Sequence, residues 1–257
     1  MDIVRDKKLK NLLDHWPPGY VATSTWLNDL FISEQLRQRY LKSEWIESMG
    51  YGAYKRPKDN VKWFGALAAF QNGSKNKIHV GGSTALAMQG ITHYIRMGKE
   101  SIFLFSKPNQ KLPVWFKNYE WGYPIEYIKT TFLPENLGIK EQEYNGFLIN
   151  TSTKERAILE CLYLIPNKFD VVECYQLIET MNTMRPNLVQ ELLENCNSIQ
   201  VKRLFLFMAK KAGLPISEFL DTNKFDLGSG VRSIVKSEGK YEPEFNLIIP
   251  KELVHYV

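Results

Sequence analysis

Turn-forming residues divide the first 60 residues into pieces that are too short for anything but small helices and a hairpin. Apolar residues of helical spacing begin near the amino terminus and are stopped by Pro17-Pro18-Gly19. Ser33 has the character of an N-cap for a helix over residues 34–43. Gly50-Tyr51-Gly52 then joins two β-prone runs, and its glycines can supply the positive φ of a hairpin turn.

Another short helix is expected between the proline turn and Ser33. Thr23, Ser24 or Thr25 can cap it, and its apolar face consists of Trp26, Leu27, Leu30 and Phe31. In the next helix Leu36 and Tyr40 are four residues apart and face inward. Three helices followed by a two-stranded wing are the layout of a winged helix-turn-helix domain, which the sequence predicts over residues 1–60.

The basic residues of this domain fall where a winged helix would meet DNA. The outward face of the third helix carries Arg37, Gln38, Arg39 and Lys42, and the hairpin is followed by Lys55, Arg56 and Lys58. Arginine and glutamine form bidentate hydrogen bonds with guanine and adenine, whereas lysines neutralise phosphates. The free N–H groups near Thr23, Ser24 and Thr25 suit a backbone phosphate. An ordinary solvated helix face is the alternative, since Glu34 and Glu44 also lie on it.

The distribution of net charge along the chain supports the interpretation that the first domain binds DNA. Residues 1–77 contain 13 Lys and Arg against 8 Asp and Glu, which gives +5, and residues 78–257 contain 20 of each. The whole excess of positive charge is therefore in the first third of the chain. A basic module followed by a neutral one indicates a polyanion-binding domain attached to a domain with another role.

Residues 61–257 are expected to form a larger mixed α/β domain. Helical and β-prone runs alternate to about residue 150. Ser152 and Glu155 have the spacing of a capping box, and further helices are expected over residues 170–182, 187–196 and 199–212, before a short β tail. The predicted fold class is α+β, with an N-terminal winged helix-turn-helix and a body whose C-terminal half is helical.

The run HVGGSTALAMQG, residues 79–90, raises the possibility of an enzyme. A strand that ends in two glycines and opens a helix cradles phosphate in nucleotidyltransferases, but two or three carboxylates on neighbouring strands must hold the Mg²⁺ ions. Glu100 is the only acidic residue between Asp59 and Glu120. We therefore interpret Gly81 and Gly82 as a tight turn between a strand and a helix.

Other enzyme signatures are weaker still. Asp226 and Glu238-Gly239-Lys240 faintly resemble the residues of a metal nuclease, but Gly239 indicates a turn. The histidines, His15, His79, His93 and His255, lack the spacing of a metal site. We expect no cofactor and no catalysis. A degenerate nucleotidyltransferase or nuclease stays open as an alternative, as does a protein-binding module without a DNA role.

The sequence also predicts where in the cell the protein is located. Three cysteines in no CxxC pattern are expected to be buried thiols in a reducing cytoplasm. The amino terminus alternates charged and apolar residues, unlike a signal peptide, and the longest apolar runs are too short to cross a bilayer. No membrane association is expected.

Several runs, taken in order, resemble the AbiEi antitoxins. They are W-I-x-x-x-G-x-G-x-Y, W-x-G-A-L-A-A-F-Q, H-V-G-G-S-T-A-L-A-M-Q-G, L-P-V-W, E-R-A-I-L-E, V-K-R-L-F-L-F-M-A and F-D-L-G-S-G. No single run is diagnostic, but together they extend over nearly the whole chain. The chain departs from the usual pattern at Glu44, before Trp45, where a glycine is expected, so the angle between wing and helix is in question.

The resemblance implies the antitoxin of a type IV toxin–antitoxin pair in bacterial phage defence. Such proteins repress their own operon by binding inverted repeats, with two copies on the operator, and they counteract a nucleotidyltransferase toxin by contact or only functionally. The larger domain is implied to neutralise the toxin and to assist DNA binding. The implied recognition-helix contacts are Gln35, Arg37, Gln38, Arg39 and Lys42, and the implied wing contacts are Lys55, Arg56 and Lys58.

Overall fold

The computed structural model describes residues 3–73, 77–92, 101–235 and 238–255, and their contacts divide the chain into two compact units. Unit 1 comprises Met1–Ile78, Asn109–Pro124 and Glu141–Asn150. Unit 2 comprises His79–Pro108, Ile125–Lys140 and Thr151–Val257. Both contain helices and strands, so the predicted α+β class is confirmed.

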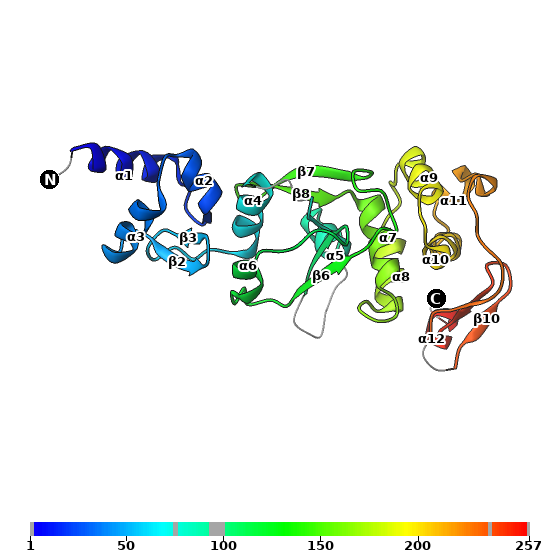
Figure 1. The fold of residues 1–257 in the computed structure, drawn as a ribbon. Helices are drawn as coiled ribbons and strands as arrows, with labels where there is room; N and C mark the ends of the chain where they lie inside the picture. The colour runs from blue at the N-terminus through cyan, green and yellow to red at the C-terminus, as the bar shows by residue number, and fades with distance from the viewer. Residues whose placement is uncertain (1–2, 74–76, 93–100, 236–237, 256–257) are drawn as a thin grey trace. The chain divides into compact units, whose positions relative to one another are not determined.

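Unit 1 begins with three helices and a small antiparallel sheet (Figure 1). The elements are α1 (Ile3–His15), β1 (Ala22–Thr23), α2 (Ser24–Asp29), α3 (Glu34–Lys42), β2 (Glu47–Gly50) and β3 (Ala53–Lys55), and the strands lie in the order β1-β3-β2. The predicted helices and hairpin are all present. Two predicted N-caps are confirmed, because Thr23 Oγ1 accepts a hydrogen bond from Trp26 N and Ser33 Oγ accepts one from Leu36 N.

A compact apolar core joins these helices to the sheet. Its fully buried members include Leu12, Trp16, Leu27, Ile32 and Ile46. The Trp16 indole also donates a hydrogen bond to Tyr20 O at 2.8 Å, so the tight turn after α1 is fixed as well as packed.

Phe31 corrects the apolar face predicted for α2, because its side chain is 80% exposed. The residue lies beyond α2 in a left-handed conformation, with φ +59°. Its N–H donates to Asn28 O at 2.9 Å, which closes the turn before α3. A turn at this point directs the ring away from the core that a continued helix would have reached.

Unit 1 extends well beyond residue 60. It also contains α4 (Trp63–Gly73), α6 (Val114–Asn118) and the residues of Glu141–Asn150, which are the outer part of the hairpin formed by β7 (Ile139–Tyr144) and β8 (Phe147–Ser152). Aromatic rings hold them together: Phe147 stacks on Tyr20 at 6.1 Å between centroids and lies 5.9 Å from Phe64. All six tryptophans of the chain belong to this unit.

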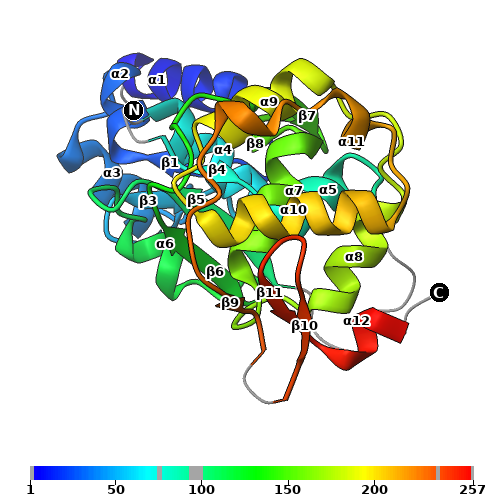
Figure 2. The same ribbon diagram turned by 90° about the vertical axis from the view of Figure 1, so that its right-hand side faces the viewer.

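Unit 2 is built on a mixed sheet covered by helices (Figure 2). Its strands are β6 (Ile125–Lys129), β5 (Ile102–Ser106), β4 (His79–Val80) and the end of β8, in that order; β5 runs parallel to β6 and antiparallel to β4, and β4 is parallel to β8. The helices are α5 (Gly82–Met88), α7 (Lys154–Leu164), α8 (Val171–Glu179), α9 (Pro186–Glu194), α10 (Ile199–Lys211) and α11 (Ile216–Phe219). The three helices predicted after residue 170 are confirmed as α8, α9 and α10.

The chain ends in the predicted β tail. A short 3-10 helix, Thr222–Lys224, precedes β9 (Arg232–Ser233), β10 (Lys240–Glu242), β11 (Leu247–Ile249) and α12 (Lys251–His255), and the strands lie in the order β10-β11-β9. Among the residues that the structure describes, no helix has the length and apolar character needed to cross a bilayer.

The predicted capping box at Ser152 and Glu155 is wrong. The N-cap of α7 is Thr153, whose side chain makes no capping hydrogen bond. Ser152 Oγ instead donates to Glu160 Oε2 at 2.8 Å, and Glu155 accepts three hydrogen bonds from Arg185. Both residues bind partners far from the helix start, which a local pattern cannot reveal.

Replacing Gly50 with alanine is predicted to destabilise unit 1 strongly. The residue has φ +130°, and an added Cβ would lie 2.9 Å from Trp115 Cβ and 3.3 Å from Trp115 Cα. We expect Gly50→Ala to lower the free energy of unfolding by about 3 kcal/mol, from backbone strain and overpacking together. Gly122→Ala is the control, because that residue has φ +78° but no atom within 4 Å of an added Cβ, and it should lose only about 1 kcal/mol. Equal losses in urea unfolding followed by circular dichroism would contradict the close packing.

Candidate nucleic-acid interface

The outer face of α3 carries four polar side chains in one row. Gln35, Gln38, Arg39 and Lys42 are exposed, and their spacing of three and four residues puts them on the same side of the helix. Tyr40 faces the core, and Leu36 and Leu41 are half-buried beneath the row. An exposed strip of two amides and two cations on a helix anchored from below has the chemistry needed to contact base edges and phosphates.

Arg37 corrects the predicted set of base contacts. Only 6% of this residue is exposed, and its Nη1 donates to Asn28 Oδ1 at 2.7 Å and to Ile32 O at 3.0 Å. The guanidinium therefore joins α2 to the turn before α3. The Arg37 side chain therefore points into the domain and does not lie on the outward face of α3.

The three basic residues near the wing are not equivalent. Lys55 Nζ lies 2.8 Å from Glu47 Oε2 on the neighbouring strand, and this hydrogen bond raises the pKa of the ammonium and lowers that of the carboxyl group. Arg56 Nη1 donates to Trp16 O at 3.0 Å. Lys58 is exposed, with its backbone at φ +64°. Lys58 is thus the side chain of this group that is presented to solvent, and the other two stabilise the domain.

The start of α2 is partly occupied by the protein itself. Thr23 caps the helix, and Ser24 N donates to Gly52 O at 2.8 Å in the wing. Thr25 is exposed, whereas Thr23 and Ser24 are half-buried. Of the three predicted phosphate contacts, Thr25 has the most accessible side chain.

Glu44 has the backbone conformation of the glycine that the resemblance led us to expect. Its φ is +57°, in the left-handed region that glycine adopts without strain. The hydrogen bonds from Glu44 N to Leu41 O and from Trp45 N to Tyr40 O close the end of α3 and start the wing. Glu44 therefore adopts, as a non-glycine residue, the left-handed conformation that a glycine would have at this position.

The sequence alone did not indicate two exposed aromatic residues beside this surface. Tyr51 at the tip of the wing is 99% exposed, and Trp45 between α3 and β2 is also exposed. The signal for Tyr51 was its position between two glycines, which have φ +130° and +77° and force the intervening side chain outward.

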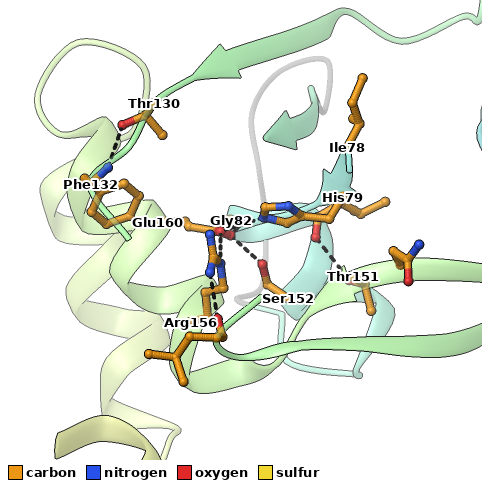
Figure 3. A network of polar contacts seen from close by, with 12 residues as sticks. Ile78, His79, Gly82, Thr130, Phe132, Thr151, Ser152, Arg156 and Glu160 are labelled. Atoms are coloured by element: carbon orange, nitrogen blue, oxygen red, sulfur yellow. Dashed lines mark hydrogen bonds and ion pairs between the residues drawn. The ribbon is translucent and has the colours of Figure 1, made fainter. Parts of the chain in front are cut away.

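The Gly81-Gly82 turn in unit 2 surrounds a buried carboxylate instead of an open phosphate site (Figure 3). Glu160 accepts hydrogen bonds from Gly82 N at 2.9 Å, His79 Nε2 at 2.9 Å, Ser152 Oγ at 2.8 Å and Arg156 Nε at 2.8 Å. A Cβ on Gly81 would lie 2.2 Å from Glu160 Oε2. The two glycines are explained by the carboxylate of α7, which fills the position that an incoming anion would need.

The network keeps Glu160 ionised. Burial alone would raise its pKa, but the hydrogen bonds from His79 and Arg156 and the positive charge of Arg156 bring the pKa down to about 2. Burial lowers the pKa of His79 despite the adjacent carboxylate, so the neutral imidazole is favoured and donates its Nε2 proton. Arg156 supplies the balancing charge, and its Nη1 also donates to Pro134 O and Leu137 O.

Other runs that carry the family resemblance also pack against one another. Arg203 of α10 donates to Leu227 O, Gly228 O and Gly230 O, which all lie within the F-D-L-G-S-G run, and to Asn246 O. Lys202 Nζ lies 5.9 Å from the centre of the Phe225 ring. These runs fix the β tail to α10, which accounts for their residue types without a ligand.

The described residues provide no support for the nucleotidyltransferase or nuclease alternatives. Glu100 and His93 lie outside the described residues. Within the described ranges, no three or more His, Cys, Asp and Glu side chains are grouped so as to hold a metal ion. The faint nuclease pattern is also dispersed, since Asp226 Oδ1 accepts from Gly228 N and Glu238 pairs with Lys251.

Replacing Glu160 with glutamine is predicted to destabilise unit 2 and change its pH dependence. Removing the charge leaves Arg156 buried without its partner, which should cost about 3 kcal/mol at pH 7. Because the pKa of Glu160 is lower in the folded than in the unfolded protein, the wild type loses this stabilisation as the pH falls from about 4.5 towards 2. Glu160→Gln should lack that part of the acid dependence.

The matched control is Glu191→Gln, a change to an exposed carboxylate on α9. Urea unfolding followed by circular dichroism from pH 3 to 7 measures both variants. If Glu160→Gln were as stable as Glu191→Gln at neutral pH, the buried network would not stabilise the unit.

Comparisons with known proteins identify the family. A family model described as "Transcriptional regulator, AbiEi antitoxin N-terminal domain" matches residues 5–97, and one described as "Transcriptional regulator, AbiEi antitoxin, Type IV TA system" matches residues 99–250. A solved structure, that of the RV2827C protein from Mycobacterium tuberculosis, is 12% identical with a TM-score of 0.64, over 97% of this chain and 92% of that one, and it shows the fold alone. The comparison with curated proteins gives no match. The chain belongs to the AbiEi family of transcriptional regulators, the antitoxins of type IV toxin–antitoxin systems.

Proposed function

We propose that this protein is a DNA-binding repressor that controls its own operon and serves as the antitoxin of its pair. The observation that carries the proposal is the exposed row of Gln35, Gln38, Arg39 and Lys42 on α3. The family assignment supports the regulatory role, and the positive charge of the first 77 residues supports an anionic partner.

Each member of the row has a distinct expected role. Arg39 offers a planar pair of donors that fits guanine O6 and N7, and the amides of Gln35 and Gln38 fit the N6 and N7 edge of adenine. Lys42, in the last turn of α3, suits a phosphate, as do Lys58 and Thr25 at the edges of the domain. Arg37 and Tyr40 hold the helix from below, which allows exposed side chains to be presented in a fixed orientation.

We further propose that two copies bind an inverted repeat. One α3 helix reads a short half-site in the major groove, and proteins of this type gain affinity by pairing two half-sites about one helical turn apart. The operator is therefore expected to be palindromic.

The toxin partner is proposed from the family, whose description names a type IV toxin–antitoxin system. We propose that the toxin is a nucleotidyltransferase and that this protein counteracts it without catalysis of its own. The Glu160 carboxylate supports this, because it occupies a strand-to-helix turn of the kind at which a nucleotidyltransferase would bind phosphate.

Replacing Arg39 and Lys42 with alanine is predicted to weaken operator binding. Loss of a base contact by Arg39 should cost about 1 to 3 kcal/mol and relax specificity at one position of each half-site. Loss of Lys42 should weaken all duplexes alike and reduce the salt slope by about 1. Fluorescence anisotropy with upstream DNA and a shuffled duplex, across a salt series, measures both effects.

The control for charge is Lys240→Ala, which removes an exposed lysine of unit 2. It should leave both the affinity and the slope unchanged. Equal and weak binding of the wild type to both duplexes would refute the proposed repressor.

Repression and neutralisation are predicted to separate. With the variant and toxin produced from independent promoters, the Arg39→Ala, Lys42→Ala double variant should lose repression of an operon reporter but still restore growth to cells that express the toxin. Loss of both activities in a variant with wild-type thermal stability would show that neutralisation depends on DNA binding.

A further inference from the structure

Helix α6 lies along the edge strand of the wing. A Cβ on Gly50, at the tip end of β2, would be 2.9 Å from Trp115 Cβ, so the backbone of α6 touches the turn directly. Helix α6 is therefore packed against β2 at the tip end of the wing.

The inner side of α6 is held firmly in unit 1. Trp115 and Phe116 are buried, and the indole of the buried Trp121 donates to Phe116 O at 2.7 Å. The Trp121 ring also packs on Phe116 and Tyr119, with centroids 5.0 and 4.5 Å away. These contacts pack α6 against the segment that follows it.

The outer side of α6 is presented to solvent next to the wing. Val114 is 69% exposed, and Lys117 and Asn118 are exposed one turn later. Lys117 is two residues after Trp115, whose backbone lies against the tip end of the wing at Gly50. It is an exposed cation beside a wing whose own Lys55 is paired with Glu47.

We infer that α6, packed against the wing, is part of the same DNA-binding surface and that Lys117 contacts the phosphate backbone of the bound duplex. The inference rests on the proposed DNA binding and assigns a contact to a segment that lies outside the first 60 residues. The inference supplies a phosphate contact near the wing that two basic residues of the wing do not provide. Lys55 forms an ion pair with Glu47 and Arg56 donates a hydrogen bond to Trp16 O, whereas the Lys117 side chain is exposed to solvent.

The first test measures the affinity of Lys117→Ala and Lys117→Glu for operator DNA. Loss of one phosphate contact should weaken binding to operator and shuffled duplexes alike by roughly three- to tenfold and reduce the salt slope by about 0.9. Charge reversal should weaken binding further. Lys240→Glu is the matched control in unit 2 and should have no effect on the slope.

The second test locates the contact. Lys117→Cys, labelled with an iron chelate that cleaves nearby DNA, should cut the operator backbone beside each half-site, and labelled Lys240→Cys should not cut it. The three native cysteines are buried, so labelling is directed to the introduced thiol.

The outcomes distinguish this inference from the proposed function. If Lys117 variants bind like the wild type and the labelled protein does not cut, while the Arg39 and Lys42 variants lose binding, the inference is overturned and the repressor stands. If the wild type shows no salt-dependent binding, both fail. If Lys117→Glu loses toxin neutralisation but retains full DNA affinity, α6 belongs to a toxin surface and the inference is overturned.

Discussion

The ionised Glu160 is the interaction on which unit 2 depends. Its two oxygens accept hydrogen bonds from β4, from the first turn of α5, from the end of β8 and from α7 itself, so one carboxylate joins four elements of the unit. The low pKa of the group means that this junction is charged at any physiological pH. Arg156 balances the charge and in turn holds the carbonyl groups of Pro134 and Leu137. Removing either ion would leave the other buried without its partner, which costs more than the pair contributes when both are present.

Local signals in the sequence predicted most of the elements but few of their partners. The N-caps at Thr23 and Ser33, the wing turn and the helices after residue 170 all depend on neighbouring residues, and the structure confirms them. Arg37 was placed on the wrong face because helical spacing alone does not distinguish an exposed arginine from one whose head group reaches a carbonyl. Ser152 and Glu155 had the spacing of a cap, yet their partners, Glu160 and Arg185, were selected by the tertiary fold.

The extent of unit 1 is the feature of the fold that is hardest to predict from the sequence. The sequence pattern changes near residue 61, which suggests a domain boundary there. In the structure, contacts between residues far apart in the sequence extend unit 1 beyond that point. Phe147 stacks on Tyr20, and Trp115 packs against Gly50, although each pair is separated by more than 60 residues. The surface proposed for DNA therefore rests on a larger body than a winged helix alone.

The distribution of the tryptophans has a practical consequence. All six lie in unit 1, and the aromatic residues of unit 2 are phenylalanine and tyrosine. Excitation at wavelengths absorbed only by indole therefore reports on unit 1, while circular dichroism reports on both units. The protein carries its own spectroscopic means of asking whether its two units unfold in one cooperative step or in two.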